Sequence, residues 1–233
     1  LDIKIPKGIY KENYSFVQFI EYQTCLSEKK INEYYERFGY LLALSYIFCI
    51  TDLHSENLIA NESYPVLIDI ETIFQNPPNL SGVDKVENKM FEARMINTLV
   101  RTSLLPIIFE TDLHKKKSMM DLSGLAGGEQ ELEKEFIQPV NIGKVDFHFE
   151  LKPAFLNATQ NIPLINDKKV DPANYRINIV QGFESMLCFF EKNKKKILEE
   201  LGFVQLFASK KIRCLMKTSQ KYGSLLSYGN HPN

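Results

Sequence analysis

Cysteine is scarce in this chain, and no two cysteines have the spacing of a metal-binding or redox motif. The sequence contains four, at positions 25, 49, 188 and 214, and none belongs to a C-x-x-C pair. A disulfide framework or a structural zinc site needs closer and more regular spacing. The pattern instead favours reduced, mostly buried thiols in a cytoplasmic protein.

Neither sign of charge dominates, and long apolar runs are absent. The formal net charge is −1, and the longest apolar stretch, residues 40–50, has 11 residues. Duplex nucleic acids bind strongly basic faces, and a membrane-spanning helix needs about 20 apolar residues. We therefore expect no nucleic-acid partner and no transmembrane segment. The chain also has no recognisable signal peptide and no internal repeat of the kind that builds solenoids.

The apolar content of 44% allows a sizeable core in one large domain or two small ones. Hydrophobic periodicity and breaker residues predict helices over residues 31–49, 88–104 and 171–202, with a short one from Ser219. The last long helix begins with Asp171 as N-cap and carries an apolar stripe of Ile179, Phe183, Met186, Leu187 and Phe190. Strands are predicted over residues 14–23, 64–71, 144–151 and 210–218. Residues 51–60 are predicted as a loop, and residues 111–170 as a long, glycine-punctuated segment.

Polar residues gather between two apolar elements, in "TDLHSENLIA" at residues 51–60 and "LIDIE" at residues 67–71. Asn57 follows Asp52 by five positions, and Asp69 follows Asn57 by twelve. Protein kinases share this order of a catalytic aspartate, an asparagine and a metal-binding aspartate on the next strand. Phosphoryl transfer from ATP needs a group that deprotonates the attacking hydroxyl, and hard oxygen ligands for Mg²⁺. Asp52 suits the first task; Asn57 and Asp69 suit the second, with Glu71 as a further ligand.

The chain contains a second copy of the same four letters, which serves as an internal control. "TDLH" recurs at residues 111–114, but Lys117 stands five positions after Asp112 and no acidic strand follows at the matching distance. We interpret this copy as a solvated turn. Each site residue taken alone also has an ordinary structural explanation, such as a turn cap or a satisfied histidine. Only the repeated agreement of spacing favours function.

The block "TDLHSENLIANESYPVLIDIETIF" at residues 51–74 closely resembles the signature of the dehydratase domain of class II lanthipeptide synthetases, the LanM type. "YYERFGYLLALSYIF" upstream and "DLSGLAG" downstream are similar to that family as well. The resemblance implies an α+β fold: a lipid-kinase-like catalytic C-terminal lobe, mostly helical, with short strands around the active-site loop. It implies phosphorylation of Ser and Thr in a precursor peptide with ATP and Mg²⁺, followed by elimination of phosphate to dehydroalanine or dehydrobutyrine.

By the same resemblance, Asp52, His54, Asn57, Asp69 and Glu71 serve phosphorylation. Elimination in the family depends on an Arg and a Thr six positions apart, and "RCLMKTSQKY" places Arg213 and Ser219 there. Serine replaces the family threonine, and Lys217 replaces a second arginine. Thr218 stands beside Ser219, so either hydroxyl is a candidate. The glycines at 124, 127 and 128 suit an activation-type or phosphate-contacting loop.

The opening "LDIKIPKGIY" reads like the interior of a longer protein, so we expect a partial kinase-like dehydratase domain over residues 1–233. The expected partners are a precursor peptide with a leader segment, the N-terminal lobe, and a separate zinc-dependent cyclase domain whose ligand pattern this chain lacks. Two alternatives stay open. One is a kinase-like phosphotransferase that stops at phosphorylation, and the other is a peptide-binding fragment of the fold without chemistry.

Overall fold

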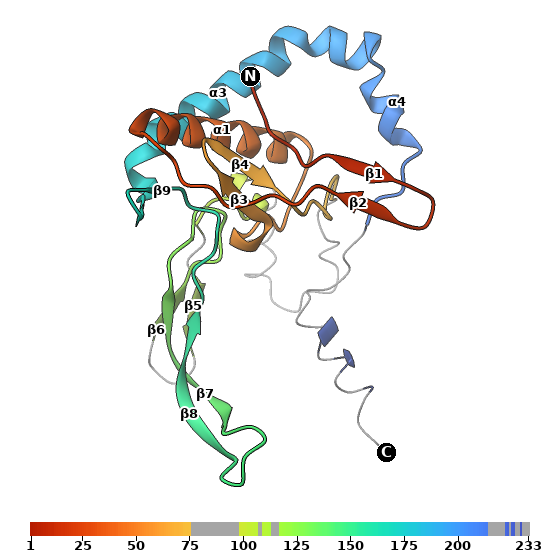
Figure 1. Cartoon of the computed structure of the whole chain (residues 1–233). Helices are drawn as coiled ribbons and strands as arrows, with labels where there is room; N and C mark the ends of the chain where they lie inside the picture. Colours follow the sequence, from red (N-terminus) through yellow and green to blue (C-terminus); the bar gives the residue numbers. More distant parts are fainter. Residues whose placement is uncertain are drawn as a thin grey trace.

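The computed structural model describes residues 1–75, 98–106, 109–112, 117–213, 222–223, 225–226 and 229. Two long helices, α1 (Glu28–Ile47) and α3 (Arg176–Lys195), lie side by side over a set of short hairpins (Figure 1). Each sheet in this part of the chain has two antiparallel strands. The fold is therefore a mixture of helices and short strands, and the α+β, lipid-kinase-like lobe stays a prediction.

Helix α1 confirms the helix predicted over residues 31–49. Ser27 caps it by accepting a hydrogen bond from the Lys30 amide, and Glu28 places a negative charge in the first turn, where the helix dipole favours it. The buried face, at helical spacing, is the centre of the main core. It consists of Ile31, Tyr34, Tyr35, Phe38, Leu41 and Leu42.

Helix α3 follows a 3₁₀ turn, η4 (Pro172–Tyr175), which Asp171 caps through the Ala173 amide, as the sequence predicts. A π turn, η5 (Lys196–Glu200), continues it to the left-handed Gly202, and α4 (Phe203–Ala208) comes next. In the predicted stripe, Ile179 and Met186 are buried, whereas Leu187 is 37% exposed. Gly39 and Gly182 let the two helices approach closely, since a Cβ on either would collide with the backbone of the other helix.

Beneath α1 lies a hairpin of β3 (Leu58–Asn61) and β4 (Tyr64–Leu67), which turns at the left-handed Glu62. Two predictions are corrected here. Residues 58–61 form a strand rather than the end of a loop, because they pair with β4 and bury Leu58 and Ala60. The strand predicted over 64–71 ends at Leu67, so Asp69 and Glu71 lie on an exposed, irregular stretch.

The N-terminal strand prediction is also too long. Strands β1 (Gly8–Tyr10) and β2 (Ser15–Val17) form a small exposed hairpin. Gln23 forms an isolated bridge to Asn61, whose side chain also donates a hydrogen bond to Gln23 Oε1. Of the residues 14–23 predicted as a strand, only Ser15–Val17 pair with β1.

Within residues 109–170 the chain forms three hairpins instead of the predicted long loop. They are β5 (Phe109–Asp112) with β6 (Lys117–Met120), β7 (Gln130–Val140) with β8 (His148–Leu156), and β9 (Leu164–Ile165) with β10 (Lys168–Lys169). The strand predicted over 144–151 begins only at His148, since residues 141–147 turn. Thr111 and Asp112 of the second "TDLH" copy lie in β5, so the predicted solvated turn is wrong for them.

Other predictions fall partly outside the described residues. Of the helix predicted over 88–104, residues 88–97 lie outside, and the rest contains the 3₁₀ turn η3 (Leu99–Thr102), which ends at the left-handed Ser103. Residues 211–213 have no regular structure, and 214–220, including Lys217, Thr218 and Ser219, lie outside the description.

The three described cysteines are free, in agreement with the predicted reduced thiols. Cys25 is buried, but Cys188 is exposed on α3, which corrects the expectation for that residue. None of the helices in the described part of the chain has the length and apolar character that crossing a membrane requires.

Candidate functional site

The loop after α1 reverses the chain through two left-handed residues, Cys49 and Asp52. Aspartate tolerates this conformation better than most residues with a side chain, although it still costs free energy. Two backbone hydrogen bonds hold the loop: Leu53 N donates to Thr102 O at 3.0 Å, and Ser55 N donates to Leu122 O at 3.0 Å. The Leu53 side chain is fully buried. Asp52 is therefore an exposed residue on a firmly anchored turn.

A single 3₁₀ turn, η1 (Ser55–Asn57), positions the next two side chains. His54 caps it, because its Nδ1 accepts a hydrogen bond from the Glu56 amide at 3.4 Å. Asn57 Nδ2 donates to the Asp52 carbonyl oxygen at 2.8 Å. The Asn57 carbonyl oxygen, Oδ1, remains available as a ligand for a cation.

A backbone ladder brings the second half of the "LIDIE" stretch against this loop. Thr51 N donates to Thr72 O at 3.2 Å, and the Thr72 hydroxyl donates back to the Thr51 carbonyl. Ile68 N donates to Asn57 O at 3.0 Å. Asp69 and Glu71 lie between Ile68 and Thr72, the two residues that these hydrogen bonds attach to the loop. Both carboxylates therefore stay near Asp52.

These residues line one pocket. It encloses about 190 Å³ and is lined by Asp52, His54, Asn57, Asp69, Glu71 and Thr72. The structure therefore brings together all five residues assigned to phosphorylation by the sequence. Three carboxylates and an amide oxygen are hard donors, which suit a divalent cation such as Mg²⁺. Among the described residues no three His, Cys, Asp or Glu side chains are arranged to hold an ion. The donor set still fits Mg²⁺, because this ion is usually held by one or two carboxylates together with substrate phosphates.

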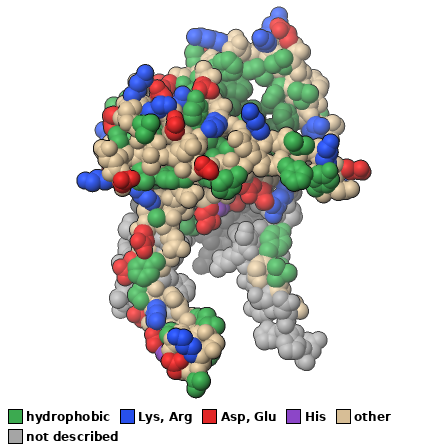
Figure 2. All heavy atoms as spheres, viewed as in Figure 1, with side chains coloured by type: hydrophobic (Ala, Val, Ile, Leu, Met, Phe, Trp, Pro, Cys, Tyr) green, Lys and Arg blue, Asp and Glu red, His purple; other side chains and the backbone are tan. Residues whose placement is uncertain are grey.

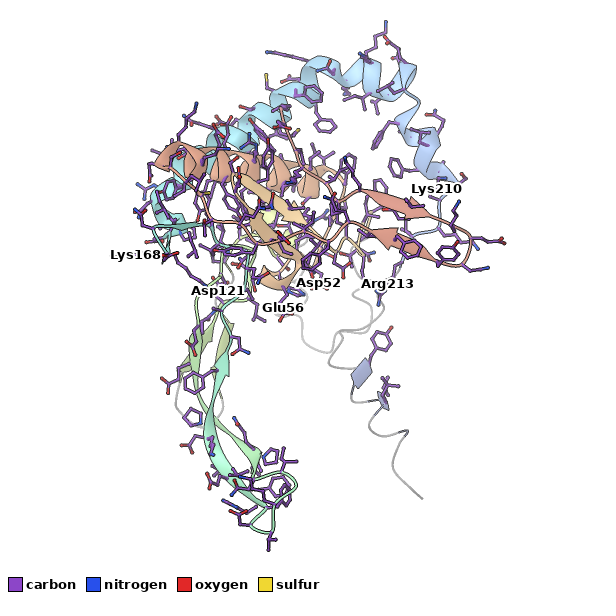
Figure 3. The ribbon with its side chains drawn as sticks, in the orientation of Figure 1. Asp52, Glu56, Asp121, Lys168, Lys210 and Arg213 are labelled. Atoms are coloured by element: carbon purple, nitrogen blue, oxygen red, sulfur yellow. The ribbon has the colours of Figure 1, made fainter. Side chains whose placement is uncertain are left out.

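Arg213, the residue assigned to elimination, contacts one of the residues that line this pocket. Its guanidinium forms an ion pair with the Glu71 carboxylate, and Gln75 Nε2 donates to the Arg213 carbonyl oxygen at 2.5 Å. The side chains of Arg213 and Glu71 are each about half exposed. Figure 3 shows Asp52, Glu56 and Arg213 along the lower edge of the body. Glu71 thus connects the pocket with Arg213, a contact that the sequence did not indicate.

A larger pocket adjoins the first and shares Asp52 and His54 with it. It encloses about 670 Å³. Sequence reasoning did not identify most of its lining, which includes Asp121, Leu122, Ser123, Phe155 and Thr159. The "DLSGLAG" match was the one available signal, since residues 121–128 form one wall.

Buried hydrogen bonds hold that wall in place. Asn161 is fully buried, and its Nδ2 donates to Gly124 O at 2.7 Å and to Ala126 O at 2.6 Å. Thr159 Oγ1 donates to Asn161 Oδ1 at 2.6 Å, and the Lys169 ammonium bonds the Gly127 carbonyl. Partial burial lowers the pKa of Lys169. These hydrogen bonds therefore fix the conformation of the glycine-rich loop. Its contact with phosphate stays a prediction.

The chain belongs to the family described as "Domain of unknown function (DUF4135)", whose model matches residues 1–233. It is also similar to a protein of Lactococcus lactis subsp. lactis named "Lacticin 481/lactococcin biosynthesis protein LcnDR2". The two are 28% identical over 239 aligned positions, which cover 96% of this chain and 25% of that protein. This chain thus spans about a quarter of the length of that relative. Together these matches confirm the resemblance to LanM-type lanthipeptide synthetases.

Proposed function

We propose that this chain acts in lanthipeptide (lantibiotic) biosynthesis as part of a dehydratase. It would transfer the γ-phosphoryl group of ATP to a Ser or Thr hydroxyl of a precursor peptide and then eliminate the phosphate. The observation that carries the proposal is the pocket shared by Asp52, Asn57 and Asp69 beside a second pocket large enough for a peptide segment. The name of the lactococcal relative, a lacticin 481/lactococcin biosynthesis protein, supports the same function.

In the phosphorylation step, Asp52 accepts the proton of the substrate hydroxyl as its oxygen attacks. The hydrogen bond from Asn57 Nδ2 to the Asp52 backbone carbonyl fixes the position of the Asn57 amide relative to Asp52. Asn57 Oδ1 and Asp69 would hold Mg²⁺, which when bound neutralises charge that develops on the phosphates. Glu71 joins them when Arg213 releases it. His54, held as the cap of η1, lines the same pocket and would orient the substrate hydroxyl.

In the elimination step, a base removes the α-proton of the phosphorylated residue. The electron pair of the Cα–H bond forms the Cα=Cβ double bond, the Cβ–O bond breaks, and phosphate leaves with the electrons of that bond. Arg213 suits the departing phosphate, because a guanidinium binds phosphate oxygens in a bidentate manner. The family places the required hydroxyl at Ser219 or Thr218. The N-terminal lobe, a zinc-dependent cyclase domain and a cytoplasmic location belong to this proposal as well.

One observation favours the narrower alternative, a phosphotransferase that does not eliminate. Arg213 is occupied by Glu71, and a guanidinium held by a carboxylate is less available to a leaving phosphate. The proposal requires this ion pair to open during the reaction. Because both side chains are half exposed, the pair contributes little, about 0–1 kcal/mol, and opens readily.

Mass spectrometry of a precursor peptide incubated with the full-length protein, ATP and Mg²⁺ distinguishes the three functions. Dehydration removes about 18 Da, phosphorylation alone adds about 80 Da, and a binding fragment leaves the mass unchanged. The Asp52→Asn variant is expected to leave the peptide unmodified. Asp112→Asn provides a matched control, since it changes the same letter in the second "TDLH" copy. Normal phosphorylation by Asp52→Asn would refute the role of Asp52.

A further inference from the structure

The β7–β8 hairpin has one apolar face that leads away from the larger pocket. Residues directly opposite in the antiparallel register share a face, as do alternate residues of one strand. Ile137 pairs with Leu151, and Pro139 pairs with Phe149. Pro153 and Phe155 continue the same row along β8. Phe155 also lines the pocket beside Asp52, so the row and the pocket are continuous.

On the opposite face of the outer half of the hairpin, the β8 residues are polar, whereas the register also places Phe136 and Val140 of β7 on that face. His148 Nε2 lies 2.6 Å from Glu150 Oε1, and Lys152 Nζ lies 3.1 Å from Glu150 Oε2. Gln138 stands on the same side, opposite Glu150. The hydrogen bond with the Asp146 backbone carbonyl, and after it the one with Glu150, raises the pKa of His148, whereas hydrogen bonds from His148 and Lys152 lower the pKa of Glu150. The charged side chains of this face pair with one another.

On the apolar face, by contrast, the described structure leaves the side chains exposed. Ile137 is 70% exposed, Phe149 62%, Leu151 63% and Phe155 52%. The hairpin extends away from the helices as a projecting arm (Figure 1), and hydrophobic side chains are visible along it and at its tip (Figure 2). A two-stranded hairpin alone is marginally stable in water, and a continuous exposed apolar row marks an interaction surface. In the described part of the chain β7 and β8 form a two-stranded sheet of their own, so each strand has one edge without a paired strand.

The pocket end of this surface is acidic. Glu56 and Asp121 line the pocket together with Asp52, and its lining contains no Lys or Arg among the described residues. Glu131 lies opposite Phe155 and Glu135 opposite Pro153, on the same face as the apolar row. Both glutamates are exposed. A ligand that follows the row into the pocket therefore meets negative charge, which favours basic side chains and disfavours acidic ones.

The pocket also contains an unsatisfied polar group. Ser123 is 5% exposed, and its hydroxyl has no hydrogen-bond partner within the described part of the chain. A buried hydroxyl without a partner costs about 1–3 kcal/mol.

We propose that the apolar face of the β7–β8 hairpin and the adjoining pocket form one track for an extended peptide segment. The segment carries apolar side chains at alternate positions, has basic rather than acidic residues between them, and presents its Ser or Thr to Asp52. Strand β8 has nine residues, so the track is about 30 Å long at about 3.3 Å per residue. This inference rests on the proposed function for the identity of the acceptor, but the binding surface itself does not.

The test uses the full-length protein and a matched pair of variants on the two faces of β7. Ile137→Thr removes an apolar side chain from the track, and Gln138→Thr changes the next residue, which faces the other way. Threonine is a good strand former in both places. The probe is a short fluorescein-labelled peptide with a single serine, leucine at alternate positions and lysine between them. Two further probes carry glutamine in place of leucine or glutamate in place of lysine.

Fluorescence anisotropy without ATP measures binding alone. Ile137→Thr is expected to weaken binding of the leucine–lysine probe about fivefold, because the variant buries less apolar surface against the peptide, and Gln138→Thr less than twofold. The glutamine and glutamate probes are expected to bind wild type at least about fivefold more weakly. Equal binding by both variants, no preference among the probes, or no binding by wild type would overturn the track. Phosphate transfer to the same probe is scored separately, so a bound but unmodified peptide contradicts the proposed function and leaves the track intact.

Discussion

Replacing Asn161 with alanine tests whether the glycine-rich wall of the larger pocket depends on one buried side chain. The substitution removes hydrogen bonds of 2.7 Å and 2.6 Å to two carbonyl oxygens and the acceptor for Thr159 at 2.6 Å. Each buried hydrogen bond contributes about 1 kcal/mol, and an orphaned buried carbonyl adds further cost. Thr159 is partly exposed and its hydroxyl lies 3.5 Å from Ala126 O, so this hydroxyl can find another partner.

The expected loss of unfolding free energy is therefore about 2–4 kcal/mol. For a domain of this size, about 2–4 °C of melting temperature is lost per kcal/mol, or about 4–16 °C in all. Thermal unfolding followed by circular dichroism measures the shift in the full-length protein. Asn157→Ala is the matched control, because Asn157 is exposed on the same pocket, and it should change stability by less than about 0.5 kcal/mol. A melting temperature for Asn161→Ala within about 1 °C of wild type would show that the Asn161 hydrogen bonds do not stabilise this wall.

Three further predictions concern the ion pair, the helix crossing and the buried ionisable groups. Arg213→Ala should lower stability by less than about 1 kcal/mol, because the pair is half exposed, yet mass spectrometry should show phosphopeptide accumulating; unchanged dehydration would argue against a role for Arg213. Gly182→Ala should destabilise the protein by about 1–3 kcal/mol in urea unfolding, since its Cβ meets the Glu36 backbone, whereas Gly128→Ala, with open space around it, should not; equal effects would contradict the close helix crossing. Burial raises the pKa of Cys25 to about 11 and that of Tyr22 to about 12. Because the folded state holds these protons more tightly, their stabilising contribution is complete below about pH 9 and is lost as the pH rises through the folded values. The urea midpoint should fall between about pH 9 and 11, and a flat profile would contradict the buried, neutral state of these groups.

The elements that were predictable from sequence are those with local causes. Helices α1 and α3 have apolar residues at helical spacing; Ser27 caps α1, and Asp171 caps the 3₁₀ turn η4 that leads into α3. The pocket around Asp52 was also predictable, because its members lie within 21 positions of one another. Short spacing between an anchored loop and the next strand leaves few ways to place these side chains.

The elements that were missed depend on residues distant in sequence. The β7 strand contains several charged residues and a register shift between Leu132 and Glu135, which obscures the alternation that marks a strand. Asn161 reaches carbonyls 35 and 37 positions earlier, and no local pattern announces such a hydrogen bond. Arg213 and Glu71 are far apart in the sequence, so the resemblance to a family could name both as candidates but not their pairing.

A crystal structure of the full-length protein with Mg²⁺ and a non-hydrolysable ATP analogue tests the central claim most directly. We predict a Mg²⁺ ion bound by Asn57 Oδ1 and an Asp69 carboxylate oxygen, each at about 2.1 Å, with the γ-phosphate facing Asp52. A nucleotide bound elsewhere, or a metal ion that touches neither residue, would contradict it.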